Sequence, residues 1–373
     1  MRLKGCKILN DAFALESKDI YIRDGKVSFS GDDSNVLDVS GLTVIPGLID
    51  IHMHGFFGIN LNHAKAEEIE KISEILLKNG VTGFLATLSS CTETELKTAV
   101  TNVSDAMDLC CAGGSLLGIY LEGPYIAISK KGGIHPKGIR TFSASEVDNL
   151  LKIAGNKIKI MTIAPECEEN MQGIRYVSEK GICASVGHTD ASAETIEMAE
   201  KAGASNATHL FNAMRGLMHR EPGTVGGVLD SNMTAELICD GVHIHPKVIR
   251  AMLKTLGTDR LIFISDSVTC AGLPDGEYTY DNKNLIKKDG KITLKDGTIS
   301  GNANPLSECI RRCVTQFGIP LADAVKCATI NPAKRIGVAD RKGSIAEGKD
   351  ADLVVVDDAF NIKYVFKNGV LIQ

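Results

Sequence analysis

The 373-residue sequence predicts an α/β fold: a (β/α)8 TIM barrel with a small β-sandwich domain formed by the N- and C-terminal segments. Two observations predict it. Short apolar runs alternate with helical patterns through the middle of the chain, which is typical of a parallel sheet. Both ends of the chain contain short extended segments separated by turns. We therefore expect a barrel of residues 46–342, inserted between residues 1–45 and 343–373 of the small domain.

Eight apolar runs are the candidate barrel strands. Eight β/α repeats over roughly 280 residues are the number that a closed barrel needs. An open, doubly wound sheet is the alternative, but it would not bring eight strand ends around one site. The runs are Val44–His54, Val81–Leu88, Leu116–Gly123, Ile158–Pro165, Ile182–His188, Asn206–Phe211, Ala235–His243 and Leu261–Asp266.

Helical patterns lie between these runs. Glu67–Asn79 is apolar on one face and is followed by Gly80, a typical residue just past a helix end. Ala193–Ala202 is followed by Gly203 in the same way. A third helix is expected over residues 246–257, because this range begins with proline and ends with glycine.

Turn dipeptides predict hairpins near both ends of the chain. Asp24-Gly25 and Asn368-Gly369 are typical of tight hairpin turns. Asp296-Gly297 predicts a further hairpin, formed by Lys291–Leu294 and Thr298–Ser300, after the eighth barrel strand. The extended segments of the small domain are Ile20–Arg23, Lys26–Phe29, Asp352–Asp357, Tyr364–Lys367 and Val370–Ile372.

Composition narrows the classes of partner and the cellular location. The net charge of −5 gives no reason to expect a nucleic acid or an anionic membrane as partner. The N-terminus lacks the apolar core of a signal peptide, and no apolar stretch has the length of a membrane-spanning helix. Eleven cysteines without a Cys-x-x-Cys pair predict reduced thiols, and hence a cytoplasmic protein.

Histidines and carboxylates stand at the ends of the predicted strands. His52 and His54 close the first run, and residues i and i+2 of a strand point to the same side, so both imidazoles can reach one metal ion. Such a pair also arises by chance, so it does not define a site alone. The other strands end at or near Glu122, His188, His209, His243 and Asp266.

In a barrel of this type, the side chains used in chemistry project from the C-terminal ends of the strands. A core histidine would explain His209 alone, and a turn cap would explain Glu122 alone, but neither explains the recurrence at equivalent positions. One carboxylate with two imidazoles leaves an open position on a metal ion, as in catalytic sites. A free carboxylate beside it, Asp266, can exchange protons with water and a leaving group. This set predicts hydrolysis of an amide or a similar bond.

The sequence resembles the amidohydrolase superfamily and, most closely, its N-acetylglucosamine-6-phosphate deacetylase branch. The resemblance extends almost from end to end, from Pro46 to Leu353. The fold that it implies is the same barrel and β-sandwich. The most specific matching stretches are Leu121-Glu122-Gly123-Pro124, Gly187-His188-Thr189, Thr208-His209-Leu210-Phe211-Asn212-Ala213-Met214, His219-Arg220-Glu221-Pro222-Gly223 and Asp240-Gly241-Val242-His243.

The resemblance implies a role for each matching residue. Glu122, His188 and His209 are the implied primary metal ligands, and Asp266 is the implied catalytic acid and base. The implied cofactor is a divalent metal ion, zinc or else iron, manganese, cobalt or nickel, with one or two ions per subunit. Because His52 and His54 are both present, a second ion bridged by Glu122 is expected. The implied substrate-binding residues are His135, Asn212, Ala213, Arg220, His243, Ile299, Ser300 and Gly301.

The implied reaction removes the acetyl group from N-acetyl-D-glucosamine 6-phosphate and yields D-glucosamine 6-phosphate and acetate. In the family, the arginine at the position of Arg220 can reach the phosphate of the neighbouring subunit, so a homodimer is implied. The same chemistry on N-acetylgalactosamine 6-phosphate stays open as an alternative. Hydrolysis of a cyclic amide or an N-acyl-amino acid fits the stretch 220–223 poorly. A non-catalytic sugar-phosphate-binding barrel is the alternative from another class, and the intact ligand set and Asp266 argue against it.

Overall fold

The computed structural model describes residues 1–31, 34–109, 115–280 and 283–373. Its largest sheet has eight strands, and every neighbouring pair in it is parallel. These strands follow one another around the sheet in chain order. They are β8 (Leu48–Asp50), β11 (Val81–Ser89), β12 (Ser115–Glu122), β13 (Ile158–Ile163), β14 (Cys183–Val186), β15 (Ala204–Ala207), β16 (Thr234–Ile238) and β17 (Leu261–Ile264).

The sheet closes on itself between β8 and β17. Just beyond these strands, the backbone N–H of Asp266 donates to the carbonyl of His52 over 2.9 Å, and the N–H of His54 donates to the carbonyl of Ser267 over 2.8 Å. The buried Asp50 carboxylate adds a side-chain link, because its Oδ1 accepts from the backbone N–H of Ser265 at 3.2 Å. The predicted (β/α)8 barrel is therefore confirmed.

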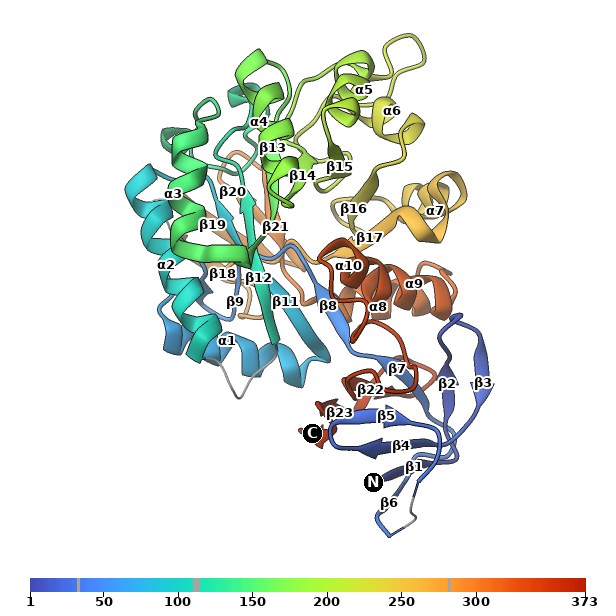
Figure 1. Ribbon diagram of the computed structural model, residues 1–373. Helices are drawn as coiled ribbons and strands as arrows, with labels where there is room; N and C mark the ends of the chain where they lie inside the picture. Colours follow the sequence, from blue (N-terminus) through green and yellow to red (C-terminus); the bar gives the residue numbers. More distant parts are fainter. Residues whose placement is uncertain (32–33, 110–114, 281–282) are drawn as a thin grey trace.

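Helices surround the barrel on its outer side (Figure 1). The three helices predicted from sequence patterns are present as α1, α5 and α7. The α-helices are α1 (Ala66–Lys78), α2 (Glu93–Leu109), α3 (Ala144–Ala154), α4 (Glu168–Glu179), α5 (Ala193–Lys201), α6 (Gly223–Asp230), α7 (Pro246–Arg260), α8 (Leu306–Thr315), α9 (Leu321–Ala328) and α10 (Ile330–Arg335). Short 3₁₀ turns are η1 (Ile128–Lys130), η2 (Pro136–Gly138) and η3 (Gly155–Lys157). Within the described ranges, no helix has both the length and the apolar composition to cross a membrane.

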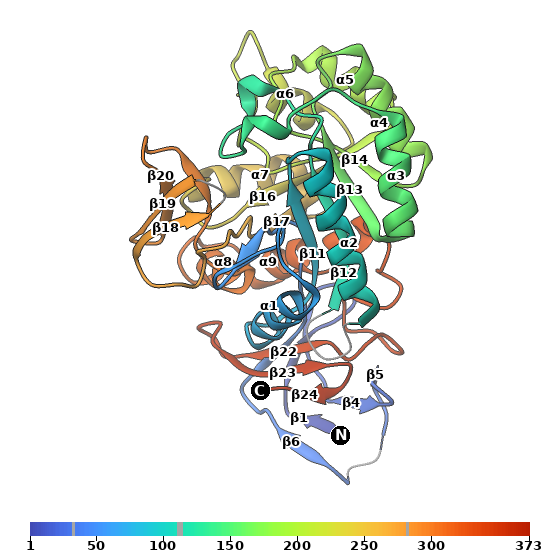
Figure 2. The same cartoon turned by 90° about the vertical axis from the view of Figure 1, so that its left-hand side faces the viewer.

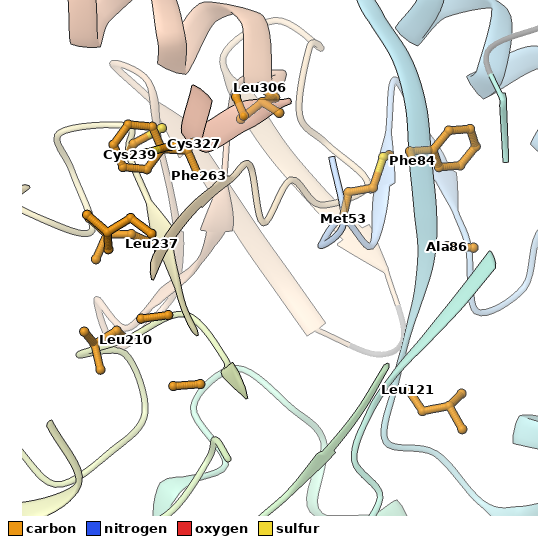
Figure 3. Close-up of a cluster of buried hydrophobic side chains, with 14 of the residues drawn as sticks. Met53, Phe84, Ala86, Leu121, Leu210, Leu237, Cys239, Phe263, Leu306 and Cys327 are labelled. Atoms are coloured by element: carbon orange, nitrogen blue, oxygen red, sulfur yellow. The ribbon is translucent and has the colours of Figure 1, made fainter. Parts of the chain in front are cut away.

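Alternate residues of the barrel strands face opposite sides, because successive side chains of a strand point in opposite directions. Leu237 and Phe263 belong to the large apolar core that includes the outer helices (Figure 3). Their neighbours Ile238 and Ile262 belong to a separate cluster, to which six barrel strands contribute. The second cluster fills the interior of the barrel, so residues that share parity with Ile238 on β16 also point inward.

The small domain is built from two sheets that contain both ends of the chain (Figures 1 and 2). Apolar residues from both sheets, including Leu3, Ile20, Val44 and Phe366, form its own core. The first sheet has the order β5-β4-β1-β6, and the second has the order β24-β23-β22-β7-β2-β3. The strands are β1 (Arg2–Lys4), β2 (Lys7–Leu9), β3 (Leu15–Ser17), β4 (Ile20–Arg23), β5 (Lys26–Ser28), β6 (Val36–Asp38), β7 (Thr43–Pro46), β22 (Leu353–Val356), β23 (Ile362–Lys367) and β24 (Val370–Leu371).

The prediction of one strand over Val44–His54 is wrong. The run contains two strands, β7 in the small domain and β8 in the barrel, and strand geometry ends at Asp50. Gly47 separates the two strands, and a Cβ atom there would lie 2.0 Å from Oγ1 of Thr82. The backbone therefore passes too close to β11 for any larger residue. The predicted boundary at residues 45/46 falls inside β7, and the exact domain limits stay a prediction.

Four buried charged residues lie where the small domain meets the barrel. We call Lys342, Asp350, Asp352 and Lys367 the seam cluster. Oδ2 of Asp352 accepts from Nζ of Lys342 at 2.5 Å and from Nζ of Lys367 at 2.9 Å. Lys342 also lies 2.9 Å from Asp350, and Lys367 donates to the carbonyl of Thr82 in β11. Each charge in this cluster has an opposite charge beside it.

A four-stranded antiparallel sheet follows β17 and lies near the barrel (Figure 2). Its last two strands form the predicted hairpin, whereas β18 and β19 were not predicted. A backbone bond from Asn302 to the carbonyl of Asp266 ties this sheet to the end of β17. The strands are β18 (Gly276–Tyr280), β19 (Lys283–Lys288), β20 (Lys291–Leu294) and β21 (Ile299–Asn302); a short hairpin, β9 (Gly55–Phe56) with β10 (Ile59–Asn60), follows β8.

Candidate active site

A cavity of about 520 Å³ opens at the C-terminal ends of the barrel strands. The antiparallel sheet contributes to its wall through Tyr280 and Leu285. The structure brings most of the predicted site residues together here. Those that line the cavity are His54, Glu122, His135, His188, His209, Asn212, Ala213, His243, Asp266, Ile299, Ser300 and Gly301.

Two predicted residues do not line this cavity. His52 is fully buried just behind it, with Nε2 3.4 Å from Oε1 of Glu122. Arg220 lies on an exposed loop between β15 and α6, and its Nη1 is 2.7 Å from Nε2 of His219. Among the described residues that were predicted to bind the substrate, Arg220 is thus the one that does not line the cavity of its own chain.

Glu122 is at the centre of the first group of candidate ligands. It ends β12, and its Oε1 is 3.0 Å from Nε2 of His188 and 3.0 Å from Nε2 of His209. The two histidine nitrogens are 3.1 Å apart. All three side chains are buried. Three ligand atoms therefore converge on one point from β12 and from the segments after β14 and β15.

Asp266 is at the centre of the second group. Its Oδ1 is 3.3 Å from Nε2 of His54 and 3.7 Å from Nε2 of His52. The other carboxylate oxygen of Glu122, Oε2, lies 3.4 Å from Nε2 of His54. Glu122 therefore stands between the two groups. In His52–Glu122–His209 and in His52–His54–Asp266, the ligand atoms all lie within 4.8 Å of one another.

Hydrogen bonds on the far side of the ring orient His188 and His54, whereas the buried Nδ1 of His209 has no hydrogen-bond partner among the described residues. Nδ1 of His188 lies 2.8 Å from the carbonyl of Lys130, which can only accept, so this nitrogen carries a proton. In the neutral ring, the lone pair of His188 is then on Nε2 and points toward Glu122. His54 has a similar outer partner, because its Nδ1 lies 3.0 Å from Oγ of Ser89.

These residues fit a divalent cation. Imidazole and carboxylate groups are the ligands that zinc, iron and related ions accept. Imidazole nitrogens and anionic oxygens face one another here at 3.0–3.7 Å, so the site must hold either protons on the rings or a metal cation between the groups. The buried Nε2 of His52 also lacks a hydrogen-bond partner in the part of the chain that the structure describes.

The charges of the ion-free cluster follow from burial and from the opposed groups. Burial alone would raise the pKa of Glu122, but the charges and hydrogen bonds of His54, His188 and His209 outweigh it and hold the pKa well below its usual value. The pKa of Asp266 is lowered in the same way, chiefly by a hydrogen bond from His54 that outweighs burial. Both carboxylates are therefore anionic at neutral pH.

The backbone is in the left-handed region at three of these positions. The φ angles are 47° at His188, 28° at His209 and 52° at Asp266. Non-glycine residues rarely adopt such angles, and they persist where the surrounding structure imposes them, often at functional sites. Each angle occurs just after a barrel strand ends, where the chain turns and directs the side chain into the cavity.

Sequence reasoning missed two residues that support this site. Glu236 in β16 is fully buried, and its Oε2 lies 2.8 Å from Nδ1 of His52. Asp240 lies 2.7 Å from Nδ1 of His243; burial lowers the pKa of His243, but Asp240 outweighs burial and raises it. One signal was present for Glu236, because it is the charged residue within the apolar run 235–239.

Comparison with known proteins agrees with this geometry. A profile of the Amidohydrolase family matches residues 43–372. The N-acetylglucosamine-6-phosphate deacetylase of Bacillus subtilis (strain 168) is 34% identical over 366 residues, which cover 95% of this chain and 92% of the relative. The N-acetylgalactosamine-6-phosphate deacetylase of Escherichia coli O157:H7 is 28% identical, with 99% of this chain and 98% of the relative covered.

The chain is also similar to a solved structure that contains a ligand. It is a mutant of the N-acetyl-D-glucosamine-6-phosphate deacetylase from Mycobacterium smegmatis, in complex with N-acetyl-D-glucosamine-6-phosphate. The TM-score is 0.93 at 28% sequence identity, with 100% of this chain and 99% of that chain covered.

Proposed function

This chain belongs to the amidohydrolase family, and we propose that it removes the acetyl group from N-acetyl-D-glucosamine 6-phosphate to give D-glucosamine 6-phosphate and acetate. One observation carries the proposal: the convergence of Glu122, His188 and His209 beside Asp266 in a cavity that can admit a small substrate. The relatives named for this reaction cover nearly the whole chain and support it.

The family is metal-dependent, and we propose where the ions bind. Glu122, His188 and His209 would hold the first ion. His52 and His54 with Asp266 would hold a second one. When bound, such an ion polarises the acetamide carbonyl and activates water. Zinc is the metal we expect first, with iron, manganese, cobalt and nickel as alternatives, because each accepts imidazole and carboxylate ligands.

Asp266 has the position and charge of a general base. Its side chain is 13% exposed and lines the cavity, and its pKa is lowered, so the carboxylate is ready to accept a proton. We propose that it takes a proton from the attacking water and then delivers one to the departing amine.

His135 can donate a hydrogen bond into the cavity. Its Nδ1 accepts from the backbone N–H of Lys137 at 3.2 Å, so the proton of the neutral ring is on Nε2. We propose that this Nε2–H stabilises the negative charge that develops on the acetamide oxygen. His243, held by Asp240, and the backbone of Asn212 and Ala213 are the proposed contacts to the sugar phosphate.

Arg220 does not line the cavity of its own chain. Its planar fork suits a phosphate, and it lies on an exposed loop outside its own cavity. We propose that it binds the phosphate in the cavity of a second copy, so that the working unit is a homodimer. We also propose a cytoplasmic location, because the nine cysteines that the structure describes are free thiols.

The test is acetate release by metal-replete protein from three sugars. We expect turnover of N-acetyl-D-glucosamine 6-phosphate, much slower turnover of its galactosamine epimer, and little of unphosphorylated N-acetyl-D-glucosamine. Faster turnover of the galactosamine epimer would replace the proposed substrate by the one named for the Escherichia coli relative. Equal rates with and without phosphate would remove the role assigned to Arg220.

A further inference from the structure

Glu236 is a buried carboxylate that the proposed chemistry does not use. It lies on β16 with the same parity as Ile238, so it points into the barrel. Glu236 is not among the described residues that line the cavity. Its Oε2 instead lies 2.8 Å from Nδ1 of His52, on the side of the ring that faces away from Glu122 and Asp266.

The carboxylate of Glu236 is held from two further directions. Nδ2 of Asn206 donates to Oε1 at 2.8 Å, and the backbone N–H of His209 lies 3.4 Å from Oε2. A carboxylate only accepts, so the amide orientation of Asn206 is also determined. Asn206 is held in turn by Ser185 and Thr234. These contacts keep Glu236 in one place beneath the site.

Because the Glu236 carboxylate accepts a hydrogen bond at this point, it determines which nitrogen of His52 carries the proton. Nδ1 must donate to Glu236, so the neutral ring presents a lone pair on Nε2. That Nε2 is buried, has no hydrogen-bond partner among the described residues, and faces Glu122 and Asp266. Carboxylates that accept from the outer nitrogen of a ligating histidine are a recurrent support of metal sites.

Glu236 acts on one of the two ligand groups more than on the other. The outer nitrogen of His188 bonds to a backbone carbonyl, and that of His54 bonds to the hydroxyl of Ser89. Of the described histidines 52, 54, 188 and 209, His52 is the one that bonds to a carboxylate through the ring nitrogen facing away from the candidate metal site. A change at Glu236 therefore alters His52 while the Glu122–His188–His209 group keeps its side-chain contacts.

We propose that Glu236 is a positioning residue that fixes the tautomer of His52 and thereby admits a second metal ion at His52, His54 and Asp266. This inference rests on the proposed metal dependence and extends it, because it names the residue that determines the number of ions. Glu236 touches neither the ion nor the substrate, and its effect passes through His52.

The decisive variant is Glu236→Gln. The glutamine oxygen accepts from Asn206 as before, so its NH₂ group faces Nδ1 of His52. The ring must then carry its proton on Nε2, where it blocks the metal. Thr162→Val is the matched control, because it removes a buried hydroxyl from the same polar layer that bonds to Tyr120 and Thr208 rather than to Asn206, Glu236 or His52.

The measurement is titration of metal-free protein with Co²⁺, followed by visible absorption and by elemental analysis after dialysis. We expect two ions per chain for the wild type and for Thr162→Val, and one for Glu236→Gln. The affinity for the second ion should fall by about 10- to 100-fold, the usual effect of removing such a support. A purely structural role would weaken both ions or neither.

Three results would overturn the inference: two tightly bound ions in Glu236→Gln, loss of both ions in that variant, or a single ion in the wild type. If Glu236→Gln does not fold, Glu236→Asp retains the charge but withdraws it from His52, and the second ion should again bind more weakly. Acetate release is measured separately. A wild type that binds two ions but releases no acetate would refute the proposed reaction and leave the role of Glu236 standing.

Discussion

Two buried clusters of charged residues lie in different parts of this chain, and they differ in whether their charges are balanced. The seam cluster pairs two lysines with two aspartates where the small domain meets the barrel. At the barrel mouth, Glu122, Asp266 and Glu236 converge on histidines, and the Nε2 of His52 is left without a hydrogen-bond partner. We call this second set, with His54, His188 and His209, the mouth cluster.

This difference in charge balance distinguishes a cluster with a structural role from one with a functional role. Burying a charge is costly unless an opposite charge or a metal ion accompanies it. The seam cluster satisfies this condition from its own residues, so it needs nothing from outside and can serve to join two domains. The mouth cluster contains no lysine or arginine, so without an ion its carboxylates are balanced only by protons on the histidine rings. A divalent cation can take the place of those protons, and this need for an exchangeable positive charge is what identifies a binding site.

The largest expected effect comes from removing one charge of the mouth cluster. Asp266→Asn should lower kcat for acetate release by about 10²- to 10⁴-fold, because a positioned general acid and base contributes that much. The variant should still bind an ion at Glu122, His188 and His209, as elemental analysis can show. Near-normal turnover would remove the catalytic role assigned to Asp266.

The same chemical change in the seam cluster should have the opposite result. Asp352→Asn leaves Lys367 without its carboxylate partner, and breaking a buried pair costs about 3–5 kcal/mol of the free energy of unfolding. Urea denaturation should detect this loss, while kcat below the unfolding transition stays close to the wild-type value. The two aspartate variants are therefore matched controls for each other. Loss of turnover in stable Asp352→Asn would contradict the separation of the clusters.

Arg220 belongs to neither cluster, and its substitution should have an intermediate effect on one kinetic constant. Arg220→Ala should raise KM for the phosphorylated sugar by about 10- to 100-fold, since a hydrogen bond to a charged group contributes about 1.5–3 kcal/mol. Arg220→Lys retains the charge but not the planar fork, so it should recover only part of the loss. The unphosphorylated sugar should be turned over equally by all three proteins.

A mixed dimer tests where Arg220 acts. In a dimer of Arg220→Ala with Asp266→Asn, one cavity combines an intact Asp266 with the arginine of the partner. Random subunit exchange between equal amounts of the two poorly active proteins makes half of the dimers mixed, each with one intact cavity of two. About a quarter of the wild-type activity should therefore return at low substrate concentration. No gain on mixing, in dimers shown to exchange subunits, would place Arg220 at the phosphate of its own chain or remove it from the site.

The smallest expected effect is a dependence of stability on pH in the seam cluster. Burial lowers the pKa of Lys367 to about 8, against about 10.4 in an unfolded chain. Between these values the unfolded chain binds more protons, so the contribution of Lys367 to the free energy of unfolding rises with pH. Lys367→Met lacks this rise. From neutral pH to about pH 9.5, the wild type should gain about 2 kcal/mol relative to the variant in urea denaturation. Parallel pH profiles would show that Lys367 titrates normally.

Much of the fold was predictable because its signals are local. Alternating apolar runs and helix-ending glycines predicted the barrel. Catalytic side chains of such barrels project from the C-terminal ends of the strands, and this rule predicted that Glu122, His188 and His209 would be close together. The bond between His52 and Glu236 joins residues 184 positions apart, and no local period carries that information. The parity of β16 would have revealed only that Glu236 points inward.

Other features were not predictable for related reasons. The run Val44–His54 looks continuous because both of its halves are buried, although they belong to different sheets. Strands β18 and β19 are largely polar and mostly not buried, so they lack an apolar run, although Leu285 of β19 is buried in a small separate cluster. The sequence identified Arg220 as a phosphate ligand only through a family resemblance, and its place outside the cavity depends on the path of a loop.

The pairing of β7 with β22 has a consequence for how the protein is made. In this antiparallel ladder Pro46 is opposite Leu353, so the two strands are separated by the whole barrel. A chain emerging from the ribosome exposes β7 long before its partner has been synthesised. The barrel can form first, and the small domain can be completed only when the last residues arrive. A truncation that removes the final strands should therefore leave β7 paired only with β2, so that its other edge is exposed and aggregation-prone beside the finished barrel.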